Sequence, residues 1–338
     1  MQAVDQEVLG QAHAWLEDGQ ACWLATVVAT YGSSPRPVGS LLTCNQSGKL
    51  VGSLSGGCVE DDLLGKLTDG VLAQDAAQFF RYGETDEEAE ELGLPCGGHL
   101  DIVIEPLGAE PSDRAHIGAL VERVAKRRCV ERRVDLRARK TSSQPVERHA
   151  PLAYDHDRGL LVQTLGPQYQ LFIIGCGMVS RYAADIAGAL GYDVTICDPR
   201  ADVLADFDAP AGVRKIRDMP DDAIREIAND PYTAIVALTH DPRIDDMGLM
   251  EAVKTEAFYI GAMGSSRTSA SRRARLAELD LTQEELDRLH APIGLPIGSK
   301  TPPEIAVAIL AEITAVRTGR LGEAHDALQP AARALAAG

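Results

Sequence analysis

A glycine-rich turn between an apolar run and a helical pattern lies near the middle of the chain. Residues 171–174 are apolar, Gly175 and Gly177 follow in the run Gly-Cys-Gly-Met-Val-Ser, and a helical spacing of apolar residues continues to Leu190. A second apolar run then ends at Asp198. A strand, a glycine turn, a helix and a strand ending in an acid make up a dinucleotide-binding βαβ unit. The pattern predicts a Rossmann-like domain in the second half of the chain.

Each residue of this turn has an expected role. Gly175 permits the tight turn, and Gly177 lets the backbone approach a pyrophosphate at the start of the helix. Ser180 occupies the third glycine position and is small enough for close packing of the helix on the strand. Asp198 is placed to bind a ribose 2′-hydroxyl, whereas Arg200 suits a 2′-phosphate. NAD and NADP are therefore both open as ligands.

Strand and helix patterns alternate through the rest of the second half, which predicts a doubly wound parallel sheet joined by right-handed crossovers. We place this Rossmann-like nucleotide-binding domain at 169–321 and an Ala-rich tail, possible as a loose helix, at 322–338. The expected strands are 170–174, 193–197, 213–216, 233–238 and 257–261, and the expected helices are 178–190, 220–229 and 243–254.

Two later turns fall at the expected carboxyl edge of this sheet. His240 follows an apolar strand and is a candidate acid, base or hydrogen-bond donor, with a capping role as the alternative. A second glycine-rich turn contains Gly261, Gly264 and Ser265 and suits an anionic group. The helix after it carries three arginines that we expect on a solvated face, namely Arg272, Arg273 and Arg275.

The bulk properties restrict the class of protein. A chain of 338 residues is long enough for two domains, and its formal net charge of −17 opposes nucleic acid and anionic membranes as partners. No apolar run approaches the roughly 18 residues of a membrane span, and the first residues do not resemble a secretory signal. We therefore expect a cytoplasmic protein. The scattered cysteines argue against a disulfide framework.

The first half combines strand and helix patterns, and we place a mixed α/β domain at 1–107. Residues 108–168 are expected to form a basic connecting segment. Within it, residues 111–148 hold eleven Lys or Arg against five Asp or Glu. Their weak alternation is compatible with a strand or with a linker, and a basic stretch in an acidic protein is also a candidate docking surface for a partner.

Two cysteines of the first half are flanked by glycines. Cys58 follows Gly57 at the expected start of a helix, where the helix dipole favours a thiolate, and Cys96 precedes Gly97. Glycines beside a thiol let a bulky group approach. Such loops can hold a soft metal centre or carry sulfur, although buried structural cysteines are the alternative. Arg36 ends a Gly-Ser-Ser-Pro loop that is a candidate anion site. We expect three other cysteines in the core: Cys22, Cys44 and Cys197.

Together these motifs resemble the XdhC/CoxI family, the maturation factors of molybdenum hydroxylases such as xanthine dehydrogenase. Cys58 and Cys96 match the family's cysteine positions, and Gly175, Gly177 and Asp198 match its Rossmann site. Cys176 departs from the small residue that is usual in this turn. The matching segments are GSSPRPVGS at 32–40, GSLSGGCVED at 52–61, LPCGG at 94–98, residues 171–200, YIGAMGSSR at 259–267 and residues 289–317.

The resemblance implies an XdhC/CoxI domain followed by a Rossmann-like domain. It also implies a chaperone that binds molybdenum cofactor (molybdopterin), supports its sulfuration and delivers it to an apo-molybdenum hydroxylase, with a cysteine desulfurase and a second copy of the chain as candidate partners. Cys58 and Cys96 would then be metal ligands or sulfur carriers.

Two alternatives stay open. One is an NAD(P)-dependent oxidoreductase with the nicotinamide near His240 and Gly261, facing Cys58 and Cys96. The other is a non-catalytic scaffold that uses the basic segment 111–148.

Overall fold

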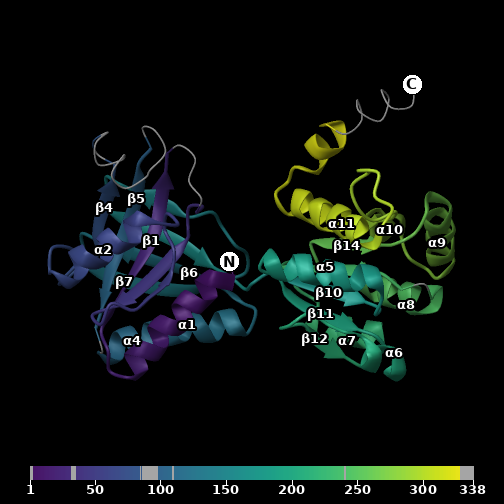
Figure 1. Cartoon of the computed structure of the whole chain (residues 1–338), viewed down its shortest axis with the longest axis horizontal. Helices are drawn as coiled ribbons and strands as arrows, with labels where there is room; N and C mark the ends of the chain where they lie inside the picture. Colours follow the sequence, from purple (N-terminus) through teal and green to yellow (C-terminus); the bar gives the residue numbers. More distant parts are fainter. Residues whose placement is uncertain are drawn as a thin grey trace. The chain divides into compact units, whose positions relative to one another are not determined.

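The chain folds into two compact units, Met1–Pro167 and Gln168–Gly338 (Figure 1). Each unit has its own sheets and its own hydrophobic core. The computed structural model describes residues 3–31, 36–83, 85, 98–108, 110–239 and 241–327.

The first unit is built on a five-stranded antiparallel sheet with the strand order β3-β2-β1-β5-β4. Its central strand β1 is an apolar run rich in β-branched residues, which suits a strand buried on both faces. The predicted strands of this domain are confirmed, and β4 is an addition that the sequence reasoning missed. The strands are β1 (Cys22–Thr30), β2 (Leu41–Asn45), β3 (Leu50–Gly52), β4 (Gln78–Tyr82) and β5 (Leu100–Leu107).

Helices cover both faces of this sheet. Trp23, Ala25 and Val27 of β1 face α2 (Cys58–Thr68), whereas Cys22 and Leu24 share a core with α1 (Ala3–Glu17) and α4 (Pro111–Ala125). The alternation follows from the two-residue period of a strand. Cys22 and Cys44 are buried as predicted.

Residues 108–168 are folded rather than extended as a solvated connection. They form α4 and a four-stranded antiparallel sheet with the order β7-β6-β9-β8. Val130, Arg132 and Val134 alternate inward along β6, and the Arg132 guanidinium pairs with the Glu105 carboxylate of the first sheet. The choice between strand and linker is thus settled as strand for residues 129–135. The strands are β6 (Cys129–Asp135), β7 (Lys140–Val146), β8 (Ala153–Asp155) and β9 (Leu160–Leu165).

The second unit contains a six-stranded sheet with the order β12-β11-β10-β13-β14-β15, in which every pairing is parallel. Counted along this unit, the order is 3-2-1-4-5-6, which is the Rossmann arrangement. The predicted doubly wound sheet is confirmed, and the short sixth strand is new. The strands are β10 (Gln170–Ile174), β11 (Asp193–Cys197), β12 (Arg214–Ile216), β13 (Thr233–Ala237), β14 (Tyr259–Ala262) and β15 (Leu289–His290).

Helices lie on both faces of the parallel sheet. One core joins the sheet to α5 and α11, and the other joins it to α7, α8 and α9 (Figure 1). The capping boxes predicted from Thr282 with Glu285 and Thr301 with Glu304 are both present. The helices are α5 (Met178–Ala189), α6 (Ala201–Asp206), α7 (Pro220–Ile227), α8 (Pro242–Ala252), α9 (Ser266–Glu278), α10 (Gln283–Asp287) and α11 (Pro302–Arg317).

None of the helices within the described ranges has the length and apolar character needed to cross a membrane. Residues 321–327 are helical, in line with the helix expected near the start of the tail, and residues 328–338 lie outside the described part.

Candidate functional site

The strand register brings three sequence motifs of the first unit to one edge of the five-stranded sheet. Thr30, the last residue of β1, pairs with Leu100, the first residue of β5. Leu100 also pairs with Tyr82, where β4 ends, and Gly52 at the end of β3 pairs with Leu42 near the start of β2. The chain therefore leaves and re-enters the sheet at this edge around three segments, 31–40, 53–57 and 83–99.

The turn between β3 and α2 is organised around the carboxylate of Glu60. Its Oε1 accepts hydrogen bonds from Ser53 Oγ at 2.8 Å and from the backbone N–H groups of Leu54, Ser55 and Gly56 at 2.7, 2.9 and 3.1 Å. Its Oε2 accepts from Ser55 Oγ at 2.7 Å and from Gly57 N–H at 3.0 Å. Two side-chain hydroxyls and four successive amides thus converge on one carboxylate.

Glu60 is almost fully buried, yet its carboxylate is held ionised. Burial alone raises the pKa of Glu60, but the hydrogen bonds from the Ser55 amide and hydroxyl, Ser53 and Gly56 outweigh burial and lower the pKa to about 2. The sequence reasoning passed over this residue. The available signal was the spacing of a capping box, because Glu60 stands three positions after the N-cap residue Gly57.

Cys58 is the first residue of α2, as predicted, and Gly57 is the N-cap. Gly56 and Gly57 are exposed, and a Cβ atom built on Gly57 would meet no atom within 4 Å. The backbone beside Cys58 is therefore open to a bulky group. The side chain of Cys58, the residues Cys96 and Gly97, and His240 of the second unit lie outside the described part of the structure, so their predicted roles stay predictions.

Two further residues at this edge bear on the site. The Arg36 guanidinium donates through Nε to the carbonyl oxygen of Ser53 at 3.3 Å, which ties the loop of the first motif to the Glu60 turn. His99 stacks on Tyr31 with ring centroids 3.7 Å apart, and the Tyr31 amide donates to the His99 carbonyl oxygen at 3.0 Å. The sequence reasoning missed His99, although it directly follows the Cys-Gly-Gly motif.

The glycine turn of the second unit has the predicted backbone. Gly175 has a φ of +99°, and a Cβ atom at this position would lie 2.3 Å from Thr239 Cγ2. Gly177 is the N-cap of α5, and Ser180 is fully buried beneath the turn. The requirement for glycine at 175 and for a small residue at 180 follows from packing. Binding of a ligand by these residues stays a prediction.

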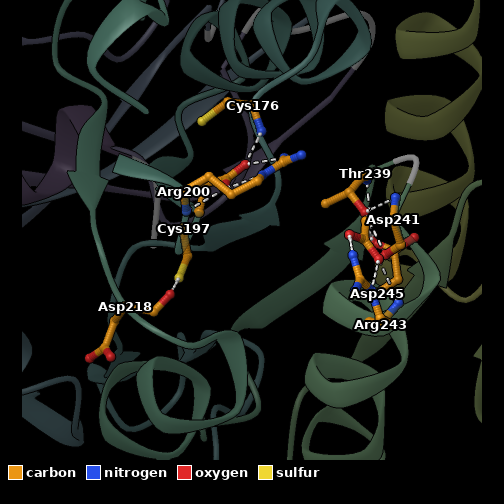
Figure 2. A network of polar contacts seen from close by, with 9 residues as sticks. Cys176, Cys197, Arg200, Asp218, Thr239, Asp241, Arg243 and Asp245 are labelled. Atoms are coloured by element: carbon orange, nitrogen blue, oxygen red, sulfur yellow. Dashed lines mark hydrogen bonds and ion pairs between the residues drawn. The ribbon is translucent and has the colours of Figure 1, made fainter. Parts of the chain in front are cut away.

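The acid at the end of β11 is engaged within the protein. Asp198 accepts the amide of Cys176 at 3.1 Å and the amide of Arg200 at 3.0 Å (Figure 2). The Arg200 guanidinium adds bonds of 2.9 Å from Nε and 2.7 Å from Nη2. Burial opposes ionisation, but the contacts with Arg200 and Cys176 prevail and lower the pKa of Asp198. A ribose hydroxyl would have to displace one of these donors.

The thiols of this region are not activated. Burial, followed by the charge of Asp198, raises the pKa of Cys176 to about 11. Cys197 is buried as predicted and donates from Sγ to the carbonyl oxygen of Asp218 at 3.4 Å (Figure 2). Burial raises the pKa of Cys197 to about 12. Neither sulfur has the electropositive surroundings of a reactive cysteine.

A buried ion network lies behind the loop that follows β13. Thr239 donates from Oγ1 to Asp245 Oδ1 at 2.8 Å, and Arg272 Nη2 meets Asp245 Oδ2 at 2.9 Å. Arg272 also donates to Asp246 at 3.2 Å and to the Met263 carbonyl oxygen at 2.9 Å. The network links the loop that packs on Gly175 to the turn that follows β14.

The expectation that Arg272 belongs to a solvated helix face is wrong, because its side chain is only 3% exposed and is committed to this network. Arg273 donates to the carbonyl oxygens of Leu286 and Leu289, and Arg275 pairs with Asp246. These contacts occupy all three arginines within the protein.

The second glycine-rich turn has two distinct parts. Gly261 is buried, and a Cβ atom there would lie 2.5 Å from Ile293 Cδ1, so packing accounts for this glycine. Gly264 is half-buried. Ser265 is exposed as the N-cap of α9 and accepts the Thr268 amide at 3.2 Å. Gly264 and Ser265 thus remain the accessible residues of this predicted anion site.

A buried carboxylate also anchors the segment after β15. Glu312 of α11 accepts hydrogen bonds from the Tyr259 hydroxyl and, at 2.7 Å, from the Gly294 amide. His290 stacks on Tyr259 and lies 3.4 Å from Glu312. Burial and the neighbouring Glu312 raise the pKa of Tyr259. The sequence reasoning missed this network, whose signal was a single acid inside an otherwise apolar helix face.

Gly175→Ala is expected to destabilise the second unit by about 2 kcal/mol, because the new methyl group would clash with Thr239 and the backbone would be held at a positive φ. The measurement is urea unfolding of the full chain. Thr239→Ser removes the methyl group that clashes, so the double variant should recover part of the loss. Equal losses in the single and double variants would contradict the role given to this contact.

The sequence was compared with models of protein families. The model described as the XdhC Rossmann domain matches residues 171–313, and the model described as the XdhC and CoxI family matches residues 15–83. The chain belongs to the XdhC and CoxI family. The matches fall on both units and confirm the resemblance drawn from the motifs.

Two relatives span nearly the same length. The molybdenum cofactor insertion chaperone PaoD of Escherichia coli strain K12 is 28% identical over 303 residues, covering 89% of this chain and 85% of PaoD. A protein of Bacillus subtilis strain 168 that is named as a probable component of xanthine dehydrogenase is 27% identical over 327 residues, covering 90% and 96%. A solved structure of a Bacillus halodurans xanthine dehydrogenase matches 94% of this chain and 96% of its own length with a TM-score of 0.73 and 23% identity, which supports the fold.

Proposed function

We propose that this protein is a molybdenum cofactor chaperone that binds the cofactor and supports its insertion into a molybdenum hydroxylase of the xanthine dehydrogenase type. The family and the relative named as an insertion chaperone support this function. The apo-hydroxylase is the proposed partner. The cofactor is then cargo that the protein receives and releases.

The observation that carries the proposal is the gathering of three motif segments at one edge of the first sheet. Register alone places the ends of β1, β3 and β4 and the start of β5 there. One of these segments contains the open Glu60 turn that presents Cys58 at the start of α2. A thiol is a soft ligand, and glycines beside it leave room for a large group. This combination suits reversible capture of a bulky metal cofactor.

Support of sulfuration is the finer part of the proposal. An accessible thiol is able to accept a sulfur atom as a persulfide from a cysteine desulfurase and to return to a thiol when the sulfur passes on. Cys58 and Cys96 are the proposed carriers. The position of Cys58 at a helix N-terminus, in an open turn, is the structural support for this role.

Cys58→Ser and Cys96→Ser are each expected to lower the molybdenum and pterin content of the purified protein by about tenfold or more, since each removes a proposed ligand. The protein is purified from a host that makes the cofactor. Molybdenum is measured by mass spectrometry and the pterin by fluorescence after oxidation.

Cys176→Ser is the matched control, because it replaces a partly exposed thiol in the other unit and leaves the proposed site intact. A wild-type protein without molybdenum or pterin would argue against the chaperone function. Normal content in both single variants and in the double variant would instead reject the two thiols as ligands.

An NAD(P)-dependent oxidoreductase is the second candidate, and the Rossmann strand order with its glycine turn favours it. The four hydrogen bonds that already engage Asp198 count against ribose binding in this arrangement. Turnover of NADH or NADPH with a small substrate by cofactor-free protein would favour this candidate. His240, a homodimer and a cytoplasmic location stay predictions.

A further inference from the structure

The Glu60 turn has the construction of an anion-binding site. Successive backbone amides that point into one concavity form a nest that binds anions, and hydroxyl groups add further donors. Here the amides of residues 54–57 and the hydroxyls of Ser53 and Ser55 all point at one position. The anion that occupies it belongs to the chain itself. Gly56 has a φ of +88°, a conformation that glycine adopts without strain.

This arrangement exceeds an ordinary helix cap. In the capping boxes of α10 and α11, the carboxylate bonds only to its N-cap residue or that residue's neighbour: Glu285 accepts from the amide and hydroxyl of Thr282, and Glu304 from the amides of Lys300 and Thr301. Glu60 makes the equivalent bond to Gly57 and then gathers donors as far back as Ser53. Its carboxylate therefore determines the path of the whole segment that leads into Cys58.

We propose that Glu60 is the positioning residue of Cys58, acting as an internal anion that fixes the turn from which the thiol is presented. The consequence for cofactor binding rests on the function proposed above. The consequence for the turn does not, because it follows from the hydrogen bonds alone. A turn that depends on an anion has a specific property: an external carboxylate of the right size should replace the missing side chain.

The test uses Glu60→Ala in the full chain without cofactor. Without its central acceptor the turn loses its fixed conformation, and we expect alkylation of Cys58 by iodoacetamide at a fixed pH to accelerate by roughly 5- to 30-fold, the factor that corresponds to 1–2 kcal/mol. The rate is followed at the Cys58 peptide by mass spectrometry. Sodium formate should return the rate toward the wild-type value, and sodium chloride at the same ionic strength should not.

Ser55→Ala serves as a milder variant in case Glu60→Ala fails to fold, since it removes one hydroxyl donor and keeps the carboxylate. It should shift the Cys58 rate in the same direction by a smaller factor. Glu285→Ala is the matched control: it removes a capping-box acid of the other unit and should leave Cys58 unchanged. An unchanged Cys58 rate in both variants of the turn, or acceleration in Glu60→Ala that formate does not reverse, would overturn the proposal.

Cofactor content separates this inference from the proposed function. Loss of molybdenum and pterin in Glu60→Ala, with recovery in formate, supports both. A Cys58 rate that responds to Glu60 and formate in a protein that never carries cofactor would sustain the positioning role and reject the chaperone function. Cofactor bound normally by Glu60→Ala with an unaltered Cys58 rate would do the reverse.

Discussion

Arg272→Met is expected to lower the free energy of unfolding of the second unit by about 3 to 5 kcal/mol, the cost of removing one partner from a buried ion network. Asp245 and Asp246 would lose the guanidinium that balances them, and the Met263 carbonyl oxygen would lose its donor. Methionine fills a similar volume, so the loss reports charge and hydrogen bonding more than a cavity. Urea unfolding followed by circular dichroism provides the measurement.

Arg267→Met is the matched control, because Arg267 is an exposed arginine on the same helix. It should change the free energy of unfolding by a few tenths of a kcal/mol, as expected of a surface substitution. Adding Asp245→Asn to Arg272→Met removes one stranded charge and should recover part of the loss. Equal effects of the Arg267 and Arg272 substitutions would show that the network contributes little to stability.

The architecture of the second unit was predictable because its determinants are local. Gly175 and Gly177 lie within one turn, Asp198 closes the adjoining strand, and each strand is a continuous apolar run. The short strand β15 escaped prediction because two residues carry no periodicity. A parallel sheet joined by helices leaves few alternative topologies once these elements are recognised.

The buried charges were not predictable because their partners are distant in sequence. Arg272 meets Asp245 and Asp246 across 27 and 26 positions, and nothing in the pattern of α9 separates it from the exposed Arg267. Arg132 had a similar effect on β6. An arginine at an inward position interrupts the apolar alternation of residues 129–135, and only its pairing with Glu105 explains its burial.

The candidate site of the first unit was predicted in part. Glycines beside Cys58 indicated an open turn, and the start of α2 at that residue is confirmed. The sequence reasoning treated the helix dipole as the main influence on Cys58 and overlooked an ionised carboxylate in the same turn. Six separate donors are aimed at Glu60, a convergence that depends on the fold of the turn and has no signature beyond the capping-box spacing.

Glu60→Gln is expected to remove about 3 kcal/mol of stability at neutral pH, and this loss should vanish in acid. The pKa of Glu60 is about 2 in the folded protein against an ordinary value of 4.5. Because the folded state binds its proton more weakly than the unfolded state, the ionised carboxylate stabilises the fold above about pH 4.5. That contribution falls away as the pH drops from 4.5 toward 2. A shift of this size corresponds to about 3 kcal/mol.

The measurement is the difference in free energy of unfolding between wild type and Glu60→Gln from pH 7 down to the lowest pH at which both fold. Comparing the two proteins cancels the other carboxylates, which titrate in both. Glutamine keeps the shape of the side chain but meets amide donors with its own NH₂ group, so it cannot replace the acceptor. Glu304→Gln, at an exposed capping box, should give a much smaller difference. A difference that stays constant over the acid range would mean that shape, and not charge, makes Glu60 the centre of this turn.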